Sequence, residues 1–336
     1  MKIVEPSIEY WSQEAGMEGV WNQIARATRV CYQSSIRESE SSEDFVKRII
    51  LKPTLIEGNL DDLEHCKFDF DKMHGAMLEH GTVYLDIDSD LKSLHELFVE
   101  NPYSRVTYDN SIIKDHFFVT TNMRVIIENN LFGLLEDWMI DTPTEHHAKR
   151  YTFSVITDIG ITREFNRHRT FSVAEQSTRY CDLTKDKFGN SLSFPLPSWI
   201  NKDSLETSEV DNCLLSDMSA DLNLATTENL NNFKVRNGTE NWDDTDFYIY
   251  ANLVAQYCYQ ALRNRGWRPE QARQVLPLGL KTQAIYTAFV DDWEHFLKLR
   301  AENVSGKPHP NAKFIAGKIR DEINNFAKEH NIDYQV

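Results

Sequence analysis

The segment from residue 163 to residue 180 concentrates positive charge in an otherwise acidic chain. It reads REFNRHRTFSVAEQSTRY and contains Arg163, Arg167, His168, Arg169 and Arg179. The whole chain has 52 acidic and 36 basic residues, so this concentration runs against the general composition. Like charges held close together oppose folding unless an anion neutralises them, and arginine binds phosphate oxygens in a bidentate manner. The segment therefore predicts a site for a phosphate-rich ligand; the alternative is a solvated basic face of a helix.

The composition indicates an ordinary soluble globular protein, with 41% hydrophobic and 26% charged residues among 336. This length suits roughly two domains, or one large domain with insertions. A chain of this size can bury about three-quarters of its unfolded surface, so it needs no disulfide or metal to fold. Its five cysteines form no CxxC pair, which favours a reducing compartment and argues against a thiolate zinc site.

The sequence also indicates in which cell compartment the protein is expected and which classes of partner it can bind. The first residues, MKIVEPS, lack the apolar core of a signal peptide, and no apolar run approaches the roughly 20 residues of a membrane span. We therefore expect a cytoplasmic protein with no membrane partner. The net charge of −16 disfavours general nucleic-acid binding. A chain with this net charge can still bind small anions in one local pocket of arginines.

Hydrophobic periodicity predicts an α+β fold in which helices dominate and a small antiparallel sheet is present. The expected strands are 82–87, 117–121 and 151–156. The expected helices are 18–33, about 60–80, 125–139, one that starts near residue 159 and carries the arginine cluster, 247–266, a short one after Pro269, and 282–300. Residues 198–246 are acidic and rich in asparagine, and we expect a flexible insertion with some helix.

Three segments, in a fixed order, carry the chemistry. The first is Arg167-His168-Arg169 followed by EQSTRY at 175–180, the second is EQARQVLPL at 270–278, and the third is HFLKLR at 295–300. A single Arg-His-Arg triplet is weak evidence, but the extended first segment followed by the other two is very specific. In these segments the chain resembles the flavin-dependent thymidylate synthases, the ThyX family. The resemblance is direct over 151–182 and 247–300, plausible over 18–33 and 72–87, and absent over about 88–150 and 198–246.

The resemblance implies a single ThyX-like catalytic domain, residues 1–336, with insertions at about 88–150 and 198–246. It also implies a homotetramer with shared active sites and tightly bound FAD. The implied reaction is reductive methylation of dUMP to dTMP, with methylene-tetrahydrofolate and NADPH as cosubstrates. Two alternatives stay open: a flavoenzyme of the same fold that modifies another pyrimidine nucleotide, for example by hydroxymethylation, and a non-catalytic nucleotide-binding homologue.

The resemblance also assigns roles to individual residues. Ser177 and Arg300 would be catalytic. The dUMP contacts would be Glu164, Arg167, Glu175, Gln176, Ser177, Thr178, Arg179, Arg273 and Arg300. The FAD contacts would be His74, Arg167, His168, Arg169, Glu175, His295 and His309. No metal is expected, and the His146-His147 pair is interpreted as a loop feature because it lacks further ligands.

Several of these residues have simpler interpretations. Ser177 could be a nucleophile, although no Asp–His pair stands at a recognisable spacing. Arg273 could cap its short helix, and His74 could be a surface histidine. Arg300 would also interact favourably with a helix C-terminus.

The chain departs from the family pattern at three positions. Glu164 replaces a glutamine, and its carboxylate would repel the nucleotide phosphate unless Arg163 or another cation neutralised it. Phe289 replaces an asparagine that faces FAD, and His309 is the nearest candidate for a histidine expected soon after Arg300. These departures leave the adenine end of FAD and the choice of pyrimidine open.

Overall fold

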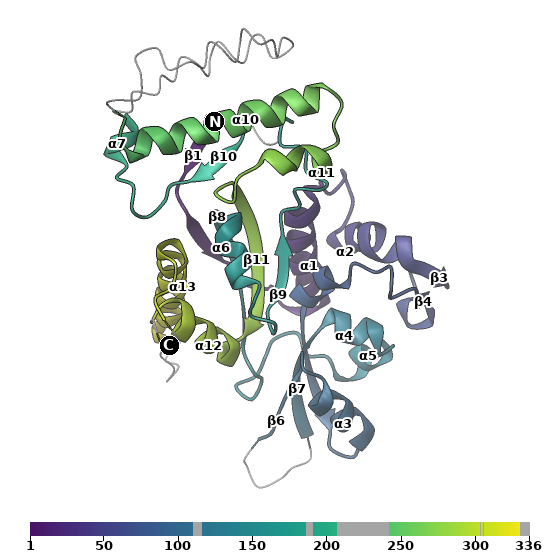
Figure 1. The fold of residues 1–336 in the computed structure, drawn as a ribbon. Helices are drawn as coiled ribbons and strands as arrows, with labels where there is room; N and C mark the ends of the chain where they lie inside the picture. Colours follow the sequence, from purple (N-terminus) through teal and green to yellow (C-terminus); the bar gives the residue numbers. More distant parts are fainter. Residues whose placement is uncertain (110–115, 186–190, 207–241, 303, 305, 330–336) are drawn as a thin grey trace.

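The computed structural model describes residues 1–109, 116–185, 191–206, 242–302, 304 and 306–329. Helices and short strands are mixed along the chain, and most of the strands pair in an antiparallel manner (Figure 1). The predicted α+β class is therefore confirmed. Cys31, Cys66, Cys181 and Cys258 are free thiols, and Cys213 lies outside the described residues. Within the described ranges, no helix combines the length and apolar character needed to cross a membrane.

A four-stranded antiparallel sheet lies at the centre of the molecule. Its strand order is β2 (Ser7–Tyr10), β8 (Arg150–Asp158), β11 (Lys281–Phe289) and β9 (Ser172–Glu175). Strands β8 and β11 pair along their whole length, from Lys281 opposite Asp158 to Phe289 opposite Arg150. The small antiparallel sheet expected from the sequence is therefore present.

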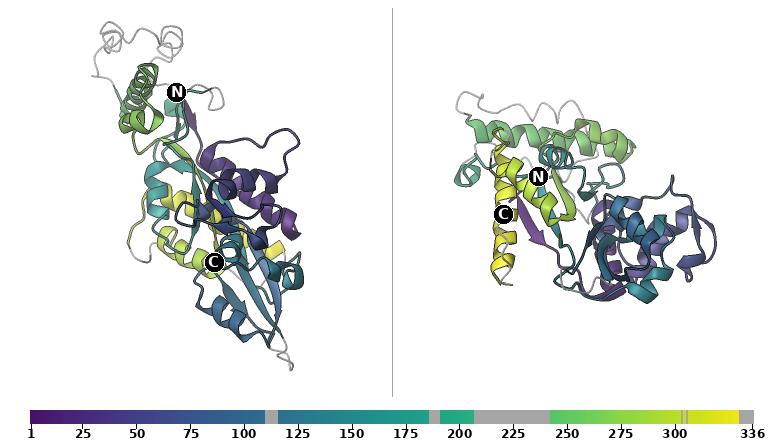
Figure 2. Two further views of the ribbon diagram at one scale, coloured as in Figure 1. Left: turned by 90° about the vertical axis from the view of Figure 1, so that its right-hand side faces the viewer. Right: turned by 90° about the horizontal axis from the view of Figure 1, so that it is seen from below.

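Helices cover both faces of this sheet. On one face lie α1 (Gly16–Tyr32) and the turn η4 (Gly75–His80), and on the other lie α6 (Ile159–Phe165), α12 (Val290–Arg300) and α13 (Pro310–Glu329). Figure 2 (right) shows α13 on one side of the strands and the N-terminal helices on the other. The core divides accordingly: Ile285 packs in the cluster of α1, whereas Tyr286 packs with α6, α12 and α13. Because helices pack on both faces of the sheet, β11 is buried along most of its length.

The single helix predicted over 282–300 is wrong in its first half. Residues Lys281–Phe289 form β11, and only Val290–Arg300 are helical. A strand that is buried on both faces loses the alternation of polar and apolar residues, so its periodicity cannot be told from that of a buried helix. The β-branched and aromatic residues of TQAIYTAF indicated the strand.

The helix predicted to carry the arginine cluster is also too long. It ends at Phe165, residues 166–171 form a turn, and β9 follows at Ser172. The helix predicted over 60–80 is wrong, since this region contains η3 (Leu63–His65), β4 (Lys67–Phe68) and η4. The helix over 125–139 is divided into α4 (Met123–Glu128) and α5 (Gly133–Trp138). The helices 18–33 and 247–266 and the strands near 82, 117 and 151 are confirmed.

Residues 82–109 and 116–149 form an excursion from the central sheet. The chain runs through β5 (Thr82–Asp88), α3 (Lys92–Glu100), β6 (Arg105–Thr107), β7 (His116–Asn122), α4 and α5. Strands β5, β7 and β6 make an antiparallel sheet of their own. The excursion closes on itself, because Arg150 Nη1 donates to Thr82 Oγ1 at 3.1 Å. We call this closure the neck of the excursion.

A third layer lies above the sheet in Figure 1. It contains β1 (Lys2–Val4) paired in parallel with β10 (Ser193–Pro195), and the helices α7 (Asp203–Glu206), α10 (Asp244–Asn264) and α11 (Pro269–Ala272). Helix α10 starts with a capping box between Asp243 and Asp246. The remaining elements are α2 (Ser42–Val46), η1 (Lys47–Leu51), η2 (Lys52–Thr54), β3 (Leu55–Glu57) and η6 (Arg273–Val275). Residues 207–241, most of the predicted flexible insertion, lie outside the described residues.

Asp158 joins the sheet to two helices, and its loss should weaken the fold. Its carboxylate accepts from the Ile161 backbone N–H (2.9 Å) at the start of α6 and from Asn311 Nδ2 (3.2 Å) in α13. Asp158→Ala removes the helix cap and leaves a buried amide without its partner, which should cost about 2 kcal/mol. Urea unfolding should show this loss, whereas Asp158→Asn, which retains an acceptor oxygen, should lose clearly less. Equal losses in the two variants would contradict the capping role.

Candidate active site

The turn between α6 and β9 presents two arginines to solvent. It is fixed by backbone hydrogen bonds from His168 to the Phe165 carbonyl (3.0 Å) and from Phe171 to the His168 carbonyl (3.1 Å). Phe171 packs against buried Trp293, with ring centroids 4.5 Å apart. Arg167 and Arg169 are exposed, and neither makes an ion pair or side-chain hydrogen bond with any described residue. Their charges are therefore free to bind an anion.

Arg300, at the end of α12, is held beside this turn. It donates from Nη1 to Glu164 Oε2 (3.0 Å), from Nη2 to the Glu164 carbonyl (2.9 Å), and from Nε to His168 Nε2 (3.3 Å). Arg300 is thus the cation that neutralises Glu164, and Arg163 is exposed without a recorded contact to it. We call Glu164, Arg167, His168, Arg169 and Arg300 the first arginine group.

His168 is neutral in this arrangement. An arginine always donates, so the Nε2 atom that faces Arg300 must be an unprotonated acceptor. Burial, together with the charges of Arg300 and His295, lowers the pKa of His168 to about 4. The His295 ring lies 6.0 Å from the His168 ring, centroid to centroid. The predicted FAD contacts His168 and His295 therefore do lie together.

The buried neutral state of His168 should make the fold less stable in mild acid. Its pKa is near 6.5 when unfolded and about 4 in the folded protein. Between pH 6.5 and pH 4, His168 binds a proton in the unfolded chain but not in the folded protein. The free energy of unfolding therefore falls as the pH drops from 6.5 toward 4. Urea unfolding at pH 7 and pH 5 should show this loss, and His168→Gln should reduce it. The exposed His309→Gln serves as the control; an unchanged pH dependence in His168→Gln would contradict the neutral state.

Glu175, at the end of β9, ties the strand to α6. Its carboxylate accepts from Thr162 Oγ1 (2.7 Å) and from Asn166 Nδ2 (3.2 Å). Asn166 in turn accepts from the buried Tyr286 hydroxyl at 3.0 Å. Sequence reasoning assigned Glu175 to the ligands but missed Asn166 and Tyr286, although Asn166 directly precedes the Arg-His-Arg triplet. The side chain of Glu175 is thus oriented by two neighbours, Thr162 and Asn166, and Tyr286 in turn fixes Asn166.

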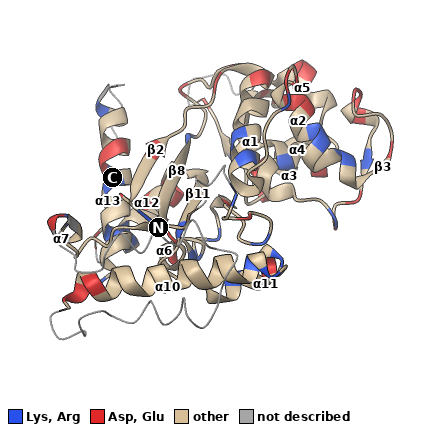
Figure 3. Cartoon of the chain, turned by 90° about the horizontal axis from the view of Figure 1, so that it is seen from above, with Lys and Arg blue, Asp and Glu red and all other residues tan. Residues whose placement is uncertain are grey.

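A second arginine group lies where the chain leaves β9. Arg273 Nη1 donates to Thr178 Oγ1 (3.2 Å), and Arg179 Nε donates to Glu270 Oε2 (3.3 Å). Arg268 binds the same carboxylate at 2.9 Å. Two arginines therefore share one acid beside Arg273, and because Arg179 and Arg268 are more than half exposed, these ion pairs are weak. Figure 3 shows basic and acidic residues mixed at α11, whereas the amino-terminal end of α10 is acidic.

Ser177 forms a turn within this second group. Its backbone N–H donates to the Cys31 carbonyl (3.1 Å), and its Oγ accepts from the backbone N–H of Arg179 (3.2 Å) and of Tyr180 (3.4 Å). Among the described residues, no histidine or carboxylate is hydrogen-bonded to the Ser177 hydroxyl. The arrangement therefore favours a ligand contact over an activated nucleophile.

The other predicted site residues occupy different surroundings. His74 packs against Tyr32 (5.9 Å), and Tyr32 packs against Tyr180 (6.2 Å), which places His74 beside the second group. Gln176 accepts from Lys281 Nζ at 3.3 Å and lines a pocket of about 370 Å³. His309 packs against Trp199 (5.5 Å), and no contact is recorded between it and either arginine group.

The His146-His147 pair is built into the excursion. Both ring nitrogens of His147 bind protein groups, Nδ1 the Thr144 hydroxyl (2.9 Å) and Nε2 the Leu85 carbonyl (3.1 Å), while the His146 ring stacks on Phe118. In the described part of the chain, no three His, Cys, Asp or Glu side chains gather as metal ligands would.

The fold and the two arginine groups define an α+β protein with a candidate site for anionic ligands. A family model described as "Thymidylate synthase complementing protein" matches residues 103–327, more than half of the 336-residue chain. The chain therefore belongs to this family, the ThyX family. The match contains all three motif segments and runs through most of 88–150 and all of 198–246, where the motifs show no resemblance.

Relatives with assigned activities align with about half of the chain. The flavin-dependent thymidylate synthase of Thermosipho melanesiensis is 29% identical over 181 residues, 52% of this chain and 64% of the relative. The enzyme of the same name from Thermus thermophilus is 28% identical over 174 residues, 52% of this chain and 53% of the relative. The chain thus spans less than two-thirds of the length of these relatives.

Among solved structures, the UMP/dUMP methylase PolB from Streptomyces cacaoi, bound with 5-Br UMP, is similar at low identity. The sequences are 16% identical, the TM-score is 0.38, and the superposition covers 98% of this chain and 92% of that chain.

Proposed function

We propose that the protein is a FAD-dependent enzyme that methylates dUMP to dTMP, with methylene-tetrahydrofolate as the carbon donor and NADPH as the reductant. The observation that carries this proposal is the pair of arginine groups, which offers two neighbouring places for anions along β9. Membership of the ThyX family and the names of the related proteins support it. We further propose a homotetramer with shared active sites and a cytoplasmic location.

The first arginine group fits a flavin dinucleotide. Arg167 and Arg169 are exposed and form no ion pair with another described residue, so their N–H groups are available to bind a pyrophosphate. His168 is neutral and adds no positive charge beside the flavin ring. The positive charge of the first arginine group therefore comes from its arginines. A bound FAD would supply the electrons that reduce the transferred carbon to a methyl group.

The second arginine group fits a nucleotide monophosphate. Arg179 and Arg273 would bind the phosphate, and the Ser177 Oγ, which accepts from the Arg179 backbone N–H, would fix the turn that carries Arg179. Because Glu270 is shared by two exposed arginines, a phosphate can displace this weak pairing. Glu175 lies between the two groups along the chain and would face both ligands.

Arg300 would act on the uracil ring. It is fixed by Glu164 and His168, so a preorganised cation would stabilise enolate-like negative charge on a uracil carbonyl oxygen, and this charge makes C5 nucleophilic. The ion pair between Arg300 and Glu164 also favours a second candidate function. The Glu164 carboxylate partly neutralises Arg300, and it places an additional hydrogen-bond acceptor near the base. A different pyrimidine, or hydroxymethyl transfer, would suit such an altered pocket.

The purified protein tests these proposals directly. We expect a yellow protein with flavin absorbance that converts dUMP, in the presence of NADPH and methylene-tetrahydrofolate, to a product of the mass of dTMP. Parallel incubations with dCMP, and a search for a product heavier by one oxygen, distinguish the second candidate. A colourless protein that cannot be reconstituted with FAD would contradict both. Bound flavin without release of label from C5-labelled dUMP would favour a non-catalytic homologue.

A further inference from the structure

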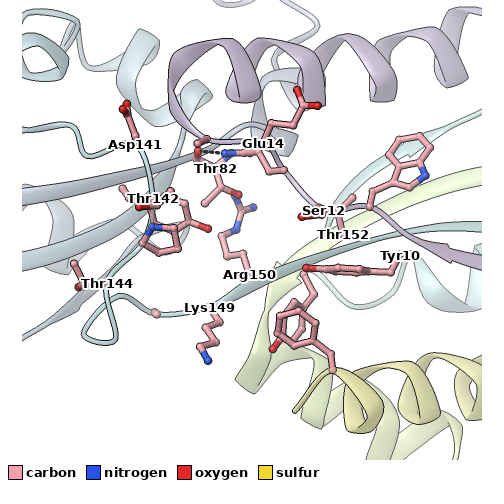
Figure 4. A pocket seen from close by; sticks show the side chains of 18 of the residues that line it. Tyr10, Ser12, Glu14, Thr82, Asp141, Thr142, Thr144, Lys149, Arg150 and Thr152 are labelled. Carbon is pink, nitrogen blue, oxygen red and sulfur yellow. Dashed lines mark hydrogen bonds between the residues drawn. The ribbon is translucent and has the colours of Figure 1, made fainter. Parts of the chain in front are cut away.

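A pocket of about 560 Å³ opens at the neck of the excursion (Figure 4). Its walls come from five parts of the chain: the end of β2 with the segment after it, β5, residues 141–145, the start of β8, and the end of α13. None of the residues assigned to dUMP or FAD lines it. The pocket is therefore separate from the candidate active site, and the inference drawn from it does not depend on the proposed reaction.

Two adjacent cations line this pocket. Lys149 is exposed and has no recorded hydrogen bond or ion pair with a described residue. Arg150 is half-buried and binds only neutral groups: the Thr82 hydroxyl (3.1 Å), the Glu79 carbonyl (3.2 Å) and, more weakly, the Ser172 hydroxyl (3.4 Å). Its buried Nε has no partner in the described structure. No carboxylate within ion-pairing distance, among the described residues, neutralises either charge.

The acidic residues of the pocket are directed elsewhere. Figure 4 shows the Glu14 and Asp141 carboxylates turned away from the Arg150 guanidinium. Glu14 accepts from Asn22 Nδ2 at 2.8 Å, and the Glu145 side chain is 88% exposed and lies by His146. The centre of the pocket thus carries positive charge, which an anionic ligand would neutralise.

Aromatic rings form the opposite side of the pocket. Tyr10, Tyr151 and Phe326 pack together with centroids 5.5 to 5.9 Å apart. Figure 4 shows the Tyr10 ring beside the space in front of Lys149 and Arg150. A planar ring can lie against such a wall, because aromatic pairs are favourable in offset and edge-on geometries.

We propose that the neck pocket binds a small aromatic anion, a ligand with one planar ring and one phosphate or carboxylate. The ring would lie on the wall of Tyr10, Tyr151 and Phe326, and the anionic group would reach Lys149 and Arg150. The volume is large enough for a ligand of this size, since pockets for small molecules typically start at about 300 Å³. Arg150 also contacts Ser172, the first residue of β9 and three residues after Arg169, so the ligand would lie one side chain away from the strand that follows the turn of Arg167 and Arg169.

Pyridoxal 5′-phosphate is a suitable probe, because it combines a planar ring, a phosphate and an aldehyde. The Lys149 amine would condense with the aldehyde and release water, and added borohydride would reduce the imine to a stable amine that peptide mass mapping locates. Burial lowers the pKa of Lys149, which increases the reactive amine form. Saturating dUMP and FAD would be present throughout, so that the arginine groups are occupied.

We expect Lys149 to be labelled at least about fivefold faster than the exposed Lys52, as a phosphate site beside the amine raises its local concentration of probe. The unreactive 4-deoxypyridoxine 5′-phosphate should protect Lys149, and pyridoxine, which lacks the phosphate, should not. Equal labelling of both lysines, or equal protection by both competitors, would overturn the proposal.

Direct binding provides the second measurement. Calorimetric titration with 4-deoxypyridoxine 5′-phosphate should show at least about tenfold weaker binding to Lys149→Glu, as expected when a charge-assisted hydrogen bond is lost. Lys52→Glu has the same charge change and should bind like the unmodified protein. Tyr10→Leu should also weaken binding, whereas Tyr103→Leu, at an exposed tyrosine of the excursion, should not. Unchanged binding in both pocket variants would refute the site.

Discussion

Arg300→Ala is expected to lower kcat/KM for dUMP by about 100-fold or more, while the protein keeps its flavin. The guanidinium is fixed by Glu164 and His168, so it requires no reorganisation when a uracil carbonyl oxygen takes up the enolate-like charge that makes C5 nucleophilic. Removing one preorganised donor to such a charge costs about 10²–10³ in rate. Steady-state kinetics with dUMP, together with the flavin absorbance of the purified variant, measure the two effects separately.

Two further variants decide whether this effect is specific to Arg300. Arg320 in α13 is partly exposed and its side chain binds only its neighbour Asp321 among the described residues, so Arg320→Ala should retain full activity. Glu164→Gln should retain most activity, because the Glu164 carbonyl still accepts from Arg300 and only the neutralising carboxylate is lost. Normal turnover in Arg300→Ala would show that the residue is not part of the active site.

The sequence named candidate residues for the site but did not indicate how they are arranged. The order of the three motifs indicated that Arg169, Arg273 and Arg300 serve anionic ligands, and the structure places them at two groups that β9 connects. The ion pair between Arg300 and Glu164 was anticipated only as a requirement for some cation, because 136 positions separate the two residues. Which arginine fills that requirement depends on the packing of α12 against α6.

The errors in secondary structure have a common physical cause. Residues 281–289 and 172–175 belong to a sheet that is covered on both faces, so the alternation that identifies a strand is missing. The polar turn at 166–171 separates α6 from β9, yet no glycine or proline marks it. In contrast, α10 and α11 have local signals, an Asp243 capping box and a Pro269 at the first turn, and both were predicted correctly.

The excursion shows the limit of local signals most clearly. Its strands β5 and β7 were predicted, but nothing in the sequence indicated that Thr82 and Arg150 would meet. That contact closes a segment of almost 70 residues and creates the neck pocket. Pairing of positions this far apart depends on the tertiary fold, which a reading of local periodicity does not include.

Combined replacement of Arg167 and Arg169 by alanine is expected to weaken FAD binding by at least about 100-fold, because each would lose a charge-assisted bond to phosphate. Both side chains are exposed and unpaired among the described residues, so the fold should not depend on them. Unfolding in urea, measured without flavin, should therefore match the unmodified protein, while fluorescence titration with FAD should show the loss. Arg320→Ala serves again as the control. Unchanged FAD affinity would exclude the turn as the pyrophosphate site, whereas a parallel loss of stability would mean that the arginines support the fold instead.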